Sequence, residues 1–196
     1  CTVTVSCMGA YSLVKLQPPG GKFLFNLILV ALMFSAHVTK IPSYMVVNGL
    51  GLINTYGALV LPNIAVAYNI FLIKQIMEKY PNELLEAARI DGAWELKIFL
   101  QMVMPALKPA TATLTVFSFV NNWNDYFSPL IYVTSQAMKT LPLALQTIGG
   151  GAAGMSVGRA GAVAAATFLM TAPTVIIFVI KQGQVMETMT YSGIKG

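Results

Sequence analysis

The sequence predicts an all-α membrane protein, a polytopic bundle of transmembrane helices. Of its 196 residues, 56% are hydrophobic and only 10% are charged, and the mean hydropathy is +0.69. A soluble domain carries about 25% charged residues, and a chain of this size cannot enclose so much apolar surface. Long apolar runs also recur between short polar segments. The composition therefore favours a membrane protein over a soluble fold.

The apolar runs indicate one partial and four full spanning helices. The partial helix is Cys1–Val14, because this run is shorter than the ~20 residues of a span and no initiator methionine precedes it. We therefore expect an N-terminally truncated chain that starts inside a helix. The full spans are expected at about Phe23–Val38, Thr55–Ile73, Pro109–Val133 and Ala160–Ile180. A loop containing Pro42 should follow the first full span, whereas Pro62 and Pro173 indicate bent, packed helices.

The basic residues predict the orientation. If the runs alternate across the membrane, nine of the 12 Lys and Arg residues share one side with Glu86. The nine are Lys15, Lys22, Lys74, Lys79, Arg89, Lys97, Lys108, Lys181 and Lys195. The other side has Lys40, Lys139 and Arg159. Because basic residues concentrate on the cytoplasmic side, residues 74–108 and the C-terminus are predicted to be cytoplasmic.

The predicted cytoplasmic loop, residues 74–108, has the pattern of two short helices. Pro81 and Glu83 are typical of a helix start, and Gly92 can end a helix in the left-handed conformation. After Gly92, apolar residues recur on one helical face, at Leu96, Phe99, Leu100 and Val103. The pattern fits either a docking element for a soluble partner or an amphipathic hairpin on lipid. The acidic residues of this loop fit anionic lipid poorly and favour the docking element.

The same loop carries a spaced motif. Glu86, Ala87 and Ala88 are followed by three residues, Gly92, nine residues, and Met102-Val103-Met104-Pro105. This resembles the Glu-Ala-Ala, Gly, Ile-x-Leu-Pro loop of ABC importer permeases, with methionines in place of Ile and Leu. Further stretches resemble the sugar-transporting, maltose-permease-like subfamily and extend the similarity over essentially the whole chain. They are Ala10–Leu13, Ile41–Tyr44, Gly51–Thr55, Ile70–Leu72, Trp123-Asn124, Pro129-Leu130 and Lys195-Gly196.

The resemblance implies a fold, a set of partners and several site residues. It implies a single transmembrane permease domain over 1–196, of the ABC importer permease type, in the multi-pass plasma (inner) membrane of a bacterium or archaeon. The implied partners are a second homologous permease subunit, two cytoplasmic ATPase subunits and an extracytoplasmic solute-binding protein. The implied ATPase-coupling residues are Glu86, Ala87, Ala88, Asp91, Gly92 and Pro105. Lys195 and Gly196 would contact the ATPase pair.

A polar cluster in the fourth run suggests the translocation path. Asp125 is the only acidic residue within a predicted span and follows Trp123 and Asn124. Amide and carboxylate groups with aromatic rings suit a neutral sugar, so these three residues are candidates for lining the path. Asp125 also lies ~24 Å along the helix from Pro109, which equally fits a position at the outer interface.

Several chemistries find no support in the sequence. There is no phosphate-binding Gly-x4-Gly-Lys-Ser/Thr motif, so we expect no enzyme activity, no catalytic residue and no cofactor in this chain, with ATP-Mg on the partner ATPase. The lone His37, without a His/Cys/carboxylate cluster, predicts no metal site. Scattered basic residues without interleaved aromatics argue against nucleic acid as a partner.

Three other functions remain open at this point. The first is an importer permease for a non-sugar solute such as a polyamine, phosphate or peptide, because the loop reads the ATPase and not the solute. The second, more remote, is an ion-coupled transporter, which would need more intramembrane carboxylates than Asp125 alone. The third is a structural scaffold, which would not need a cytoplasmic lever broken at a glycine.

Overall fold

The computed structural model describes residues 1–149 and 157–193, and all the regular structure in these ranges is helical. The chain divides into two compact units. Unit 1 comprises Cys1–Val38, Asn63–Thr115 and Gly183–Gly196, and unit 2 comprises Thr39–Pro62 and Val116–Gln182. Two helices, α9 (Lys108–Trp123) and α12 (Val157–Gly193), run from one unit into the other.

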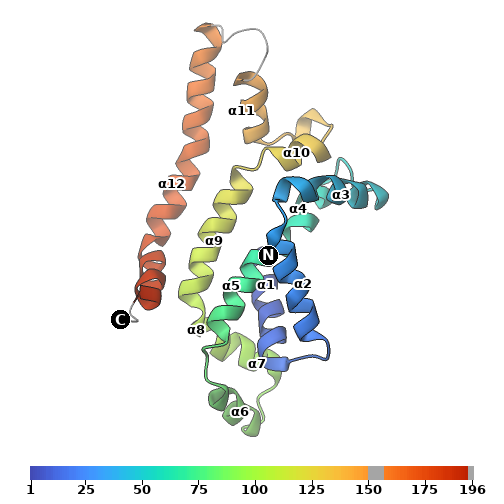
Figure 1. Cartoon of the computed structure of the whole chain (residues 1–196). Helices are drawn as coiled ribbons and strands as arrows, with labels where there is room; N and C mark the ends of the chain where they lie inside the picture. Colours follow the sequence, from blue (N-terminus) through green and yellow to red (C-terminus); the bar gives the residue numbers. More distant parts are fainter. Residues whose placement is uncertain (150–156, 194–196) are drawn as a thin grey trace. The chain divides into compact units, whose positions relative to one another are not determined.

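Three helices of unit 1 pack side by side (Figure 1). They are α1 (Thr2–Tyr11), which continues as a π-helix over Ser12–Leu16, then α2 (Gly21–Met33) and α5 (Ala67–Met77). The turn between α1 and α2 contains Pro18 and Pro19, which cannot continue a helix, and Gly20 at φ 84°. Small and apolar residues let α1 and α5 approach closely, because Cys7, Ala10 and Ile73 are each fully buried.

The segment after α5 forms α6 (Asn82–Ile90), α7 (Glu95–Ile98), a π-helix (Phe99–Val103) and α8 (Met104–Ala106). It covers one end of α1 and α5 (Figure 1). Leu85, Ile98, Phe99 and Val103 belong to the same hydrophobic core as residues of α1 and α5. This core therefore connects the polar segment directly with the apolar helices. The predicted pair of helices flanking Gly92 is confirmed.

Unit 2 has its own small core. Val47 of α3 (Ala36–Gly49), Ala58 of α4 (Tyr56–Val60) and Tyr132 of α10 (Phe127–Tyr132) are its buried members. The Asn54 carboxamide, at a backbone φ of 60°, accepts hydrogen bonds from the amides of Thr134 and Ser135. The unit also contains α11 (Leu141–Gly149) and two 3₁₀ turns, Leu61–Asn63 (which ends just inside unit 1) and Gln136–Met138.

Two helical stretches are individually long and apolar enough to cross a membrane, namely Tyr56–Met77 and Ala160–Gly183. Two bent pairs qualify only if each pair counts as one span: Gly21–Met33 with His37–Gly49, and Glu95–Ala106 with Lys108–Trp123. Helices capable of spanning are thus present, whereas the predicted number of spans stays a prediction. Pro62 lies at the 3₁₀ turn between α4 and α5, as expected of a bend, and Pro173 lies inside α12.

The predicted boundaries of the first full span were wrong. Helix α2 ends at Met33, and α3 then begins at Ala36, so Phe23–Val38 is not one helix. The predicted loop around Pro42 is in fact α3, with the proline inside it. Proline removes one backbone donor, and this loss is tolerated where neighbouring groups in a membrane protein compensate.

The third predicted full span, Pro109–Val133, is also interrupted. Helix α9 ends at Trp123, residues 124–126 are not helical, and α10 starts at Phe127. Asp125 therefore does not lie within a spanning helix, which corrects the expectation from the sequence. Its carboxylate instead accepts hydrogen bonds from the amides of Phe127 and Ser128, at 3.0 and 3.1 Å, at the start of α10.

Candidate functional site

Helix α6 is amphipathic and is held by a single deeply buried side chain. Leu85 is 1% exposed and belongs to the core of unit 1. Glu86 and Ala87 of the predicted motif lie on the exposed side, and Ala88 is half-buried against the core. The small alanines leave the backbone of α6 accessible on one side, so a partner could approach it closely. Helix α6 is thus fixed to the core on one face and exposed on the other.

The end of α6 is fixed by Gly92. Its φ is 79°, in the left-handed region that favours glycine. The Gly92 amide donates to the Arg89 carbonyl at 3.0 Å, and the Ala93 amide donates to the Ala88 carbonyl at 2.9 Å. These two bonds form a Schellman motif, which satisfies carbonyls that the end of a helix leaves free. The predicted left-handed helix end at Gly92 is therefore confirmed, and it sets the angle at which the chain leaves α6.

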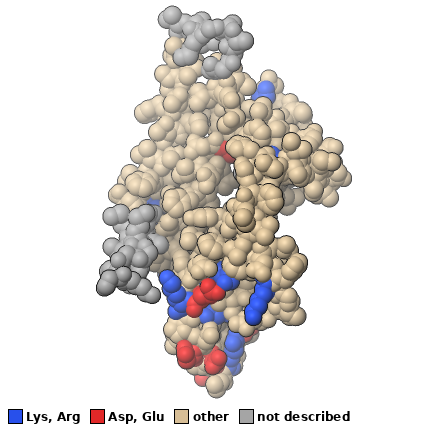
Figure 2. All heavy atoms as spheres, viewed as in Figure 1, with Lys and Arg blue, Asp and Glu red and all other residues tan. Residues whose placement is uncertain are grey.

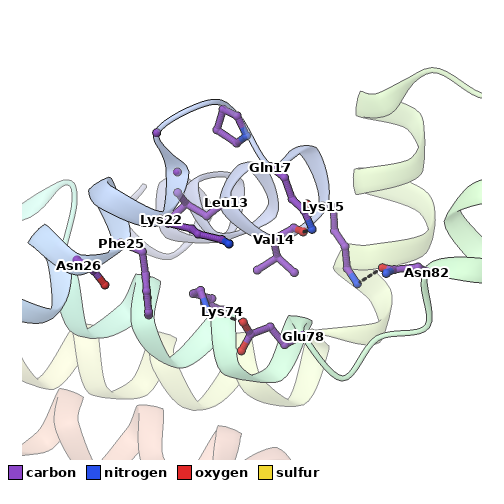
Figure 3. Close-up of a pocket in the computed structure, with 13 residues that line it drawn as sticks. Leu13, Val14, Lys15, Gln17, Lys22, Phe25, Asn26, Lys74, Glu78 and Asn82 are labelled. Atoms are coloured by element: carbon purple, nitrogen blue, oxygen red, sulfur yellow. Dashed lines mark hydrogen bonds and ion pairs between the residues drawn. The ribbon is translucent and has the colours of Figure 1, made fainter.

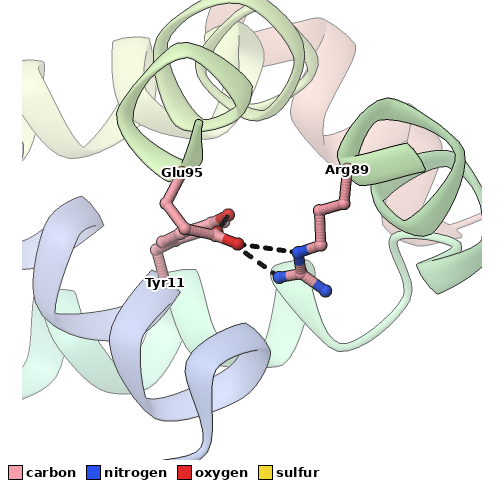
Figure 4. A network of polar contacts seen from close by, with 3 residues as sticks. All are labelled: Tyr11, Arg89 and Glu95. Carbon is pink, nitrogen blue, oxygen red and sulfur yellow. Dashed lines mark hydrogen bonds and ion pairs between the residues drawn. The ribbon is translucent and has the colours of Figure 1, made fainter. Parts of the chain in front are cut away.

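A three-residue network closes this turn (Figure 4). Arg89 of α6 donates through Nε to Glu95 Oε1 at 2.7 Å and through Nη2 to Glu95 Oε2 at 3.3 Å. The Tyr11 hydroxyl of α1 donates to Glu95 Oε2 at 2.6 Å. Because Glu95 opens α7, the network joins α6, α7 and the end of α1. A displacement of α6 would therefore pull on an apolar helix as well as on its own loop.

The network also shifts two ionisation equilibria. Hydrogen bonds from Arg89 first, and from Tyr11 second, lower the pKa of the Glu95 carboxyl. The hydrogen bond to Glu95 raises the pKa of Arg89 further. The charged forms of both residues are thus the favoured ones in the folded chain. Both side chains are more than a third exposed, so solvent weakens their attraction.

Exposed apolar side chains surround this charged turn. Leu84, Ile90 and Trp94 are 49%, 86% and 66% exposed. Glu86 and Asp91 are exposed beside them. On the face drawn in Figure 2, most charged side chains gather at the end formed by α6 and α7. Large apolar residues among carboxylates are typical of a surface that binds a protein partner.

Pro105, the last residue of the predicted coupling motif, lies exposed in α8. Its neighbours Val103 and Leu107 are both buried in the core of unit 1. Proline cannot donate the backbone hydrogen bond that a regular helix would make here, and the preceding turn, Phe99–Val103, is a π-helix. Pro105 thus lies directly after a π-helical turn, which is wider than an α-helical one, in the segment between α7 and α9.

The three predicted path residues have different environments. The Trp123 indole donates to the Met170 carbonyl of α12 at 2.9 Å and stacks on Phe119, with ring centroids 5.8 Å apart. Asn124 is exposed and donates to the Val120 carbonyl at 2.9 Å. It also lines an open cavity of ≈ 270 Å³ in unit 2, whose other lining residues are Leu145, Thr167, Met170, Thr171 and Thr174. Asp125 caps α10, as described above, and does not line this cavity.

Lys195 and Gly196, the predicted C-terminal ATPase contact, lie outside the described residues. Tyr11 and Glu95 are site residues that sequence reasoning missed. Arg89 and Glu95 carry opposite charges on either side of a glycine that ends a helix, and this pattern in the sequence could have indicated their ion pair. Tyr11 offered no such signal, since it lies in an apolar run 84 residues from its partner.

The chain is similar in sequence to several transport proteins. It is 38% identical over 139 residues to protein LplC of Bacillus subtilis, covering 71% of this chain and 46% of LplC. It is 33% identical over 192 residues to the arabinooligosaccharides transport system permease protein AraQ of Halalkalibacterium halodurans, covering 97% of this chain and 67% of AraQ. It is also 33% identical to the sn-glycerol-3-phosphate transport system permease protein UgpE of Yersinia pseudotuberculosis, covering 92% of this chain and 63% of UgpE. The chain thus spans between about half and two thirds of these relatives.

A solved structure has the same fold. It is a bacterial ABC transporter involved in the import of the acidic polysaccharide alginate, with a TM-score of 0.78 and 26% sequence identity. The similarity covers 91% of this chain and 69% of that chain. The sequence profile described as "Binding-protein-dependent transport system inner membrane component" matches residues 4–184. The chain therefore belongs to this family of inner-membrane transport permeases, as the Glu86–Gly92 motif predicted.

Proposed function

We propose that the chain is the membrane-spanning permease subunit of an ATP-driven ABC importer for a sugar or oligosaccharide. It forms half of the translocation path and couples to a cytoplasmic ATPase through Glu86–Gly92. The observation that carries the coupling role is the construction of α6: one face is buried through Leu85, and the other presents Glu86 and Ala87 to solvent. The sugar assignment is supported by the similarity to AraQ.

The proposed coupling follows from the contacts of α6. A partner ATPase that closes on ATP would push on the exposed residues Glu86, Ala87 and Ile90. The Schellman turn at Gly92 transmits this push to α7 without bending freely, because two backbone hydrogen bonds fix it. The Arg89–Glu95–Tyr11 network and the shared core then pass it to α1 and α5. Residues 74–108 and the C-terminus would accordingly lie in the cytoplasm.

The proposed path contact lies at the cavity beside Asn124. Its lining includes three threonines, Thr167, Thr171 and Thr174, along one face of α12. Hydroxyl and carboxamide groups pair with sugar hydroxyls in both directions, as donors and as acceptors. A full path requires the second permease subunit, which would face this one. Asn124 is thus the path candidate for which the structure offers a cavity.

Reconstitution in liposomes tests this function. The full-length protein, its neighbouring permease, the ATPase and the binding protein are combined, and ATP hydrolysis is measured with a panel of ligands on the binding protein. Stimulation by one sugar class supports the proposal. Stimulation by sn-glycerol 3-phosphate alone, the solute in the name of the relative UgpE, would keep the importer and overturn the sugar assignment. Absence of stimulation by every ligand, in a complex that assembles, contradicts the importer itself.

A further inference from the structure

A second polar cavity lies within unit 1. It is an open cavity of ≈ 880 Å³ at the junction of α1, α2 and α5 (Figure 3). Three lysines line it, each from a different element: Lys15 from the π-helix after α1, Lys22 from the first turn of α2, and Lys74 from α5. Glu78 is its only acidic lining residue, so the lining carries a net charge of +2.

The three ammonium groups differ in how they are neutralised. Lys74 forms an ion pair with Glu78 and lies over the Phe25 ring, 4.0 Å from its centroid. Lys15 donates to two neutral acceptors, the Tyr80 carbonyl at 2.8 Å and Asn82 Oδ1 at 2.7 Å. In the described ranges, no carboxylate lies within ion-pair distance of Lys15 or Lys22. Among the residues that the structure describes, Lys15 and Lys22 therefore have no directly paired carboxylate.

Desolvation makes this lack costly for Lys15. Burial lowers the pKa of its ammonium, and the longer-range attraction of Glu83 and Glu78 opposes that change. A bound anion would compensate the desolvated charge. The Lys22 ammonium points into the cavity (Figure 3), and the backbone start of α2, at Gly20 and Gly21, lines the same cavity. The positive end of the 13-residue helix α2 adds to the attraction for an anion.

The surroundings of the cavity favour a lipid over a soluble anion. Leu13, Val14 and Phe25 form an apolar part of the lining. Next to it, Leu16, Phe23 and Leu24 are 48%, 70% and 51% exposed, in a protein of a membrane family. The cavity thus combines cations with apolar surface at the end of the helices, and a phospholipid headgroup with its acyl chains offers the complementary pair of groups. Basic cavities between membrane helices bind anionic headgroups in this way.

We propose that this cavity binds the phosphate-bearing headgroup of an anionic phospholipid, with Lys15 and Lys22 contacting the phosphate. The inference goes beyond transport and does not depend on which solute is carried. It also places a lipid next to α6, because Lys15 bonds to Tyr80 and to Asn82, where that helix begins. Lipid binding would hold this start in place.

The test measures lipid retained by the assembled transporter. The full-length complex is reconstituted in nanodiscs of phosphatidylcholine with a minor fraction of phosphatidylglycerol, then extracted, and bound lipid is quantified by native mass spectrometry. Lys22→Gln and the pair Lys15→Gln/Lys22→Gln are compared with Lys79→Gln. Lys79 is an exposed lysine on α5's C-terminal side that does not line the cavity, so it controls for the change in overall charge.

We expect each lysine lost from the cavity to reduce retained phosphatidylglycerol about fivefold, with no change in Lys79→Gln. Equal retention in the pair and in the wild type, or an equal loss in Lys79→Gln, overturns the site. If millimolar inorganic phosphate displaces the lipid while the detergent is unchanged, the cavity is a site for a soluble anion, and the lipid assignment is overturned. Phosphatidylglycerol that is absent from the assembled complex would likewise overturn it, since a partner subunit would then cover the cavity. Intact assembly and solute-stimulated ATP hydrolysis separate any of these failures from failure of the proposed function.

Discussion

The Tyr11 hydroxyl donates a 2.6 Å hydrogen bond to Glu95 Oε2, across 84 residues of sequence. Tyr11 is 5% exposed at the end of α1, whereas Glu95 opens α7 just after the glycine turn. The tyrosine ring also contacts Phe99, with ring centroids 5.3 Å apart. Through this one side chain, an apolar helix contacts both the charged turn and the hydrophobic part of the following helical turn.

Tyr11→Phe should weaken coupling while preserving the fold. The ring and its contact with Phe99 remain, and only the hydrogen bond to Glu95 is lost, which should cost no more than about 1 kcal/mol because the Glu95 side chain is 42% exposed. The expected result is a lower ratio of solute uptake to ATP hydrolysis in proteoliposomes, at normal assembly. Tyr56→Phe is the matched control, because Tyr56 is 71% exposed and its removal leaves this network intact. An unchanged ratio in Tyr11→Phe would show that the network is structural only.

The Glu95 network predicts a pH dependence of stability. Since Arg89 and Tyr11 lower the pKa of the Glu95 carboxyl in the folded chain, its ionised form stabilises the fold above the unfolded pKa of about 4.3. This contribution is lost as the pH falls below that value and through the folded pKa. It should not exceed about 1 kcal/mol, because the Glu95 side chain is 42% exposed. The thermal midpoint of wild type minus that of Glu95→Gln, measured across this range, should shrink on acidification.

Substitutions at Gly92 should rank by their tolerance of a positive φ. No atom lies within 4 Å of a Cβ built there, so the cost is one of backbone conformation and not of crowding. We expect Gly92→Ala to lose about 1–2 kcal/mol, Gly92→Asn less, and Gly92→Val more. Thermal unfolding of the purified protein gives the order. Equal losses for Asn and Val would mean that residue 92 does not keep the left-handed conformation in the folded protein.

The helix end at Gly92 could be predicted because local chemistry decides it. A glycine after a short amphipathic stretch is a strong signal for a left-handed helix end, and the structure bears this out. The contact of Tyr11 with Glu95 could not be predicted, because it depends on how α1 packs beside α7. Tyr11 lies in an apolar run, and nothing in the composition of that run indicates that its hydroxyl contacts Glu95.

The boundaries of the apolar runs were the weakest predictions, for a related reason. Hydropathy averages over a window, so it does not detect a helix that stops and restarts within an apolar run, as at residues 124–126. It likewise misjudged α3, where Pro42 lies inside a helix. In both places the backbone is decided by side-chain hydrogen bonds and packing. One example is the Asp125 carboxylate, which accepts hydrogen bonds from the amides of Phe127 and Ser128. Another is Lys40, which donates to the Ser128 hydroxyl at 2.7 Å.

Charge reversal at Glu86 tests the docking surface. Glu86 is exposed and forms no ion pair with any residue that the structure describes, so Glu86→Lys should leave thermal stability within about 0.5 kcal/mol of wild type. If α6 docks on the ATPase, the reversal should reduce uptake strongly, and Glu86→Gln should reduce it less. Co-purification of the ATPase with each variant gives the direct measurement. Wild-type uptake and co-purification in Glu86→Lys would contradict the coupling role.

Asp125 and Asn124 can be separated by two pairs of substitutions. If Asp125 acts as a cap for α10, Asp125→Ala should cost about 1 kcal/mol, and Asp125→Asn should restore most of it, because the amide oxygen still accepts from Phe127 and Ser128. Asn124 follows the end of α9, donates to the Val120 carbonyl of that helix and lines the cavity together with threonines of α12. Asn124→Leu should therefore reduce solute uptake with little change in the thermal midpoint, and Asn124→Gln should retain part of the uptake. If Asp125→Asn instead abolishes uptake at wild-type stability, the carboxylate itself serves the path, and its capping bonds are incidental to transport.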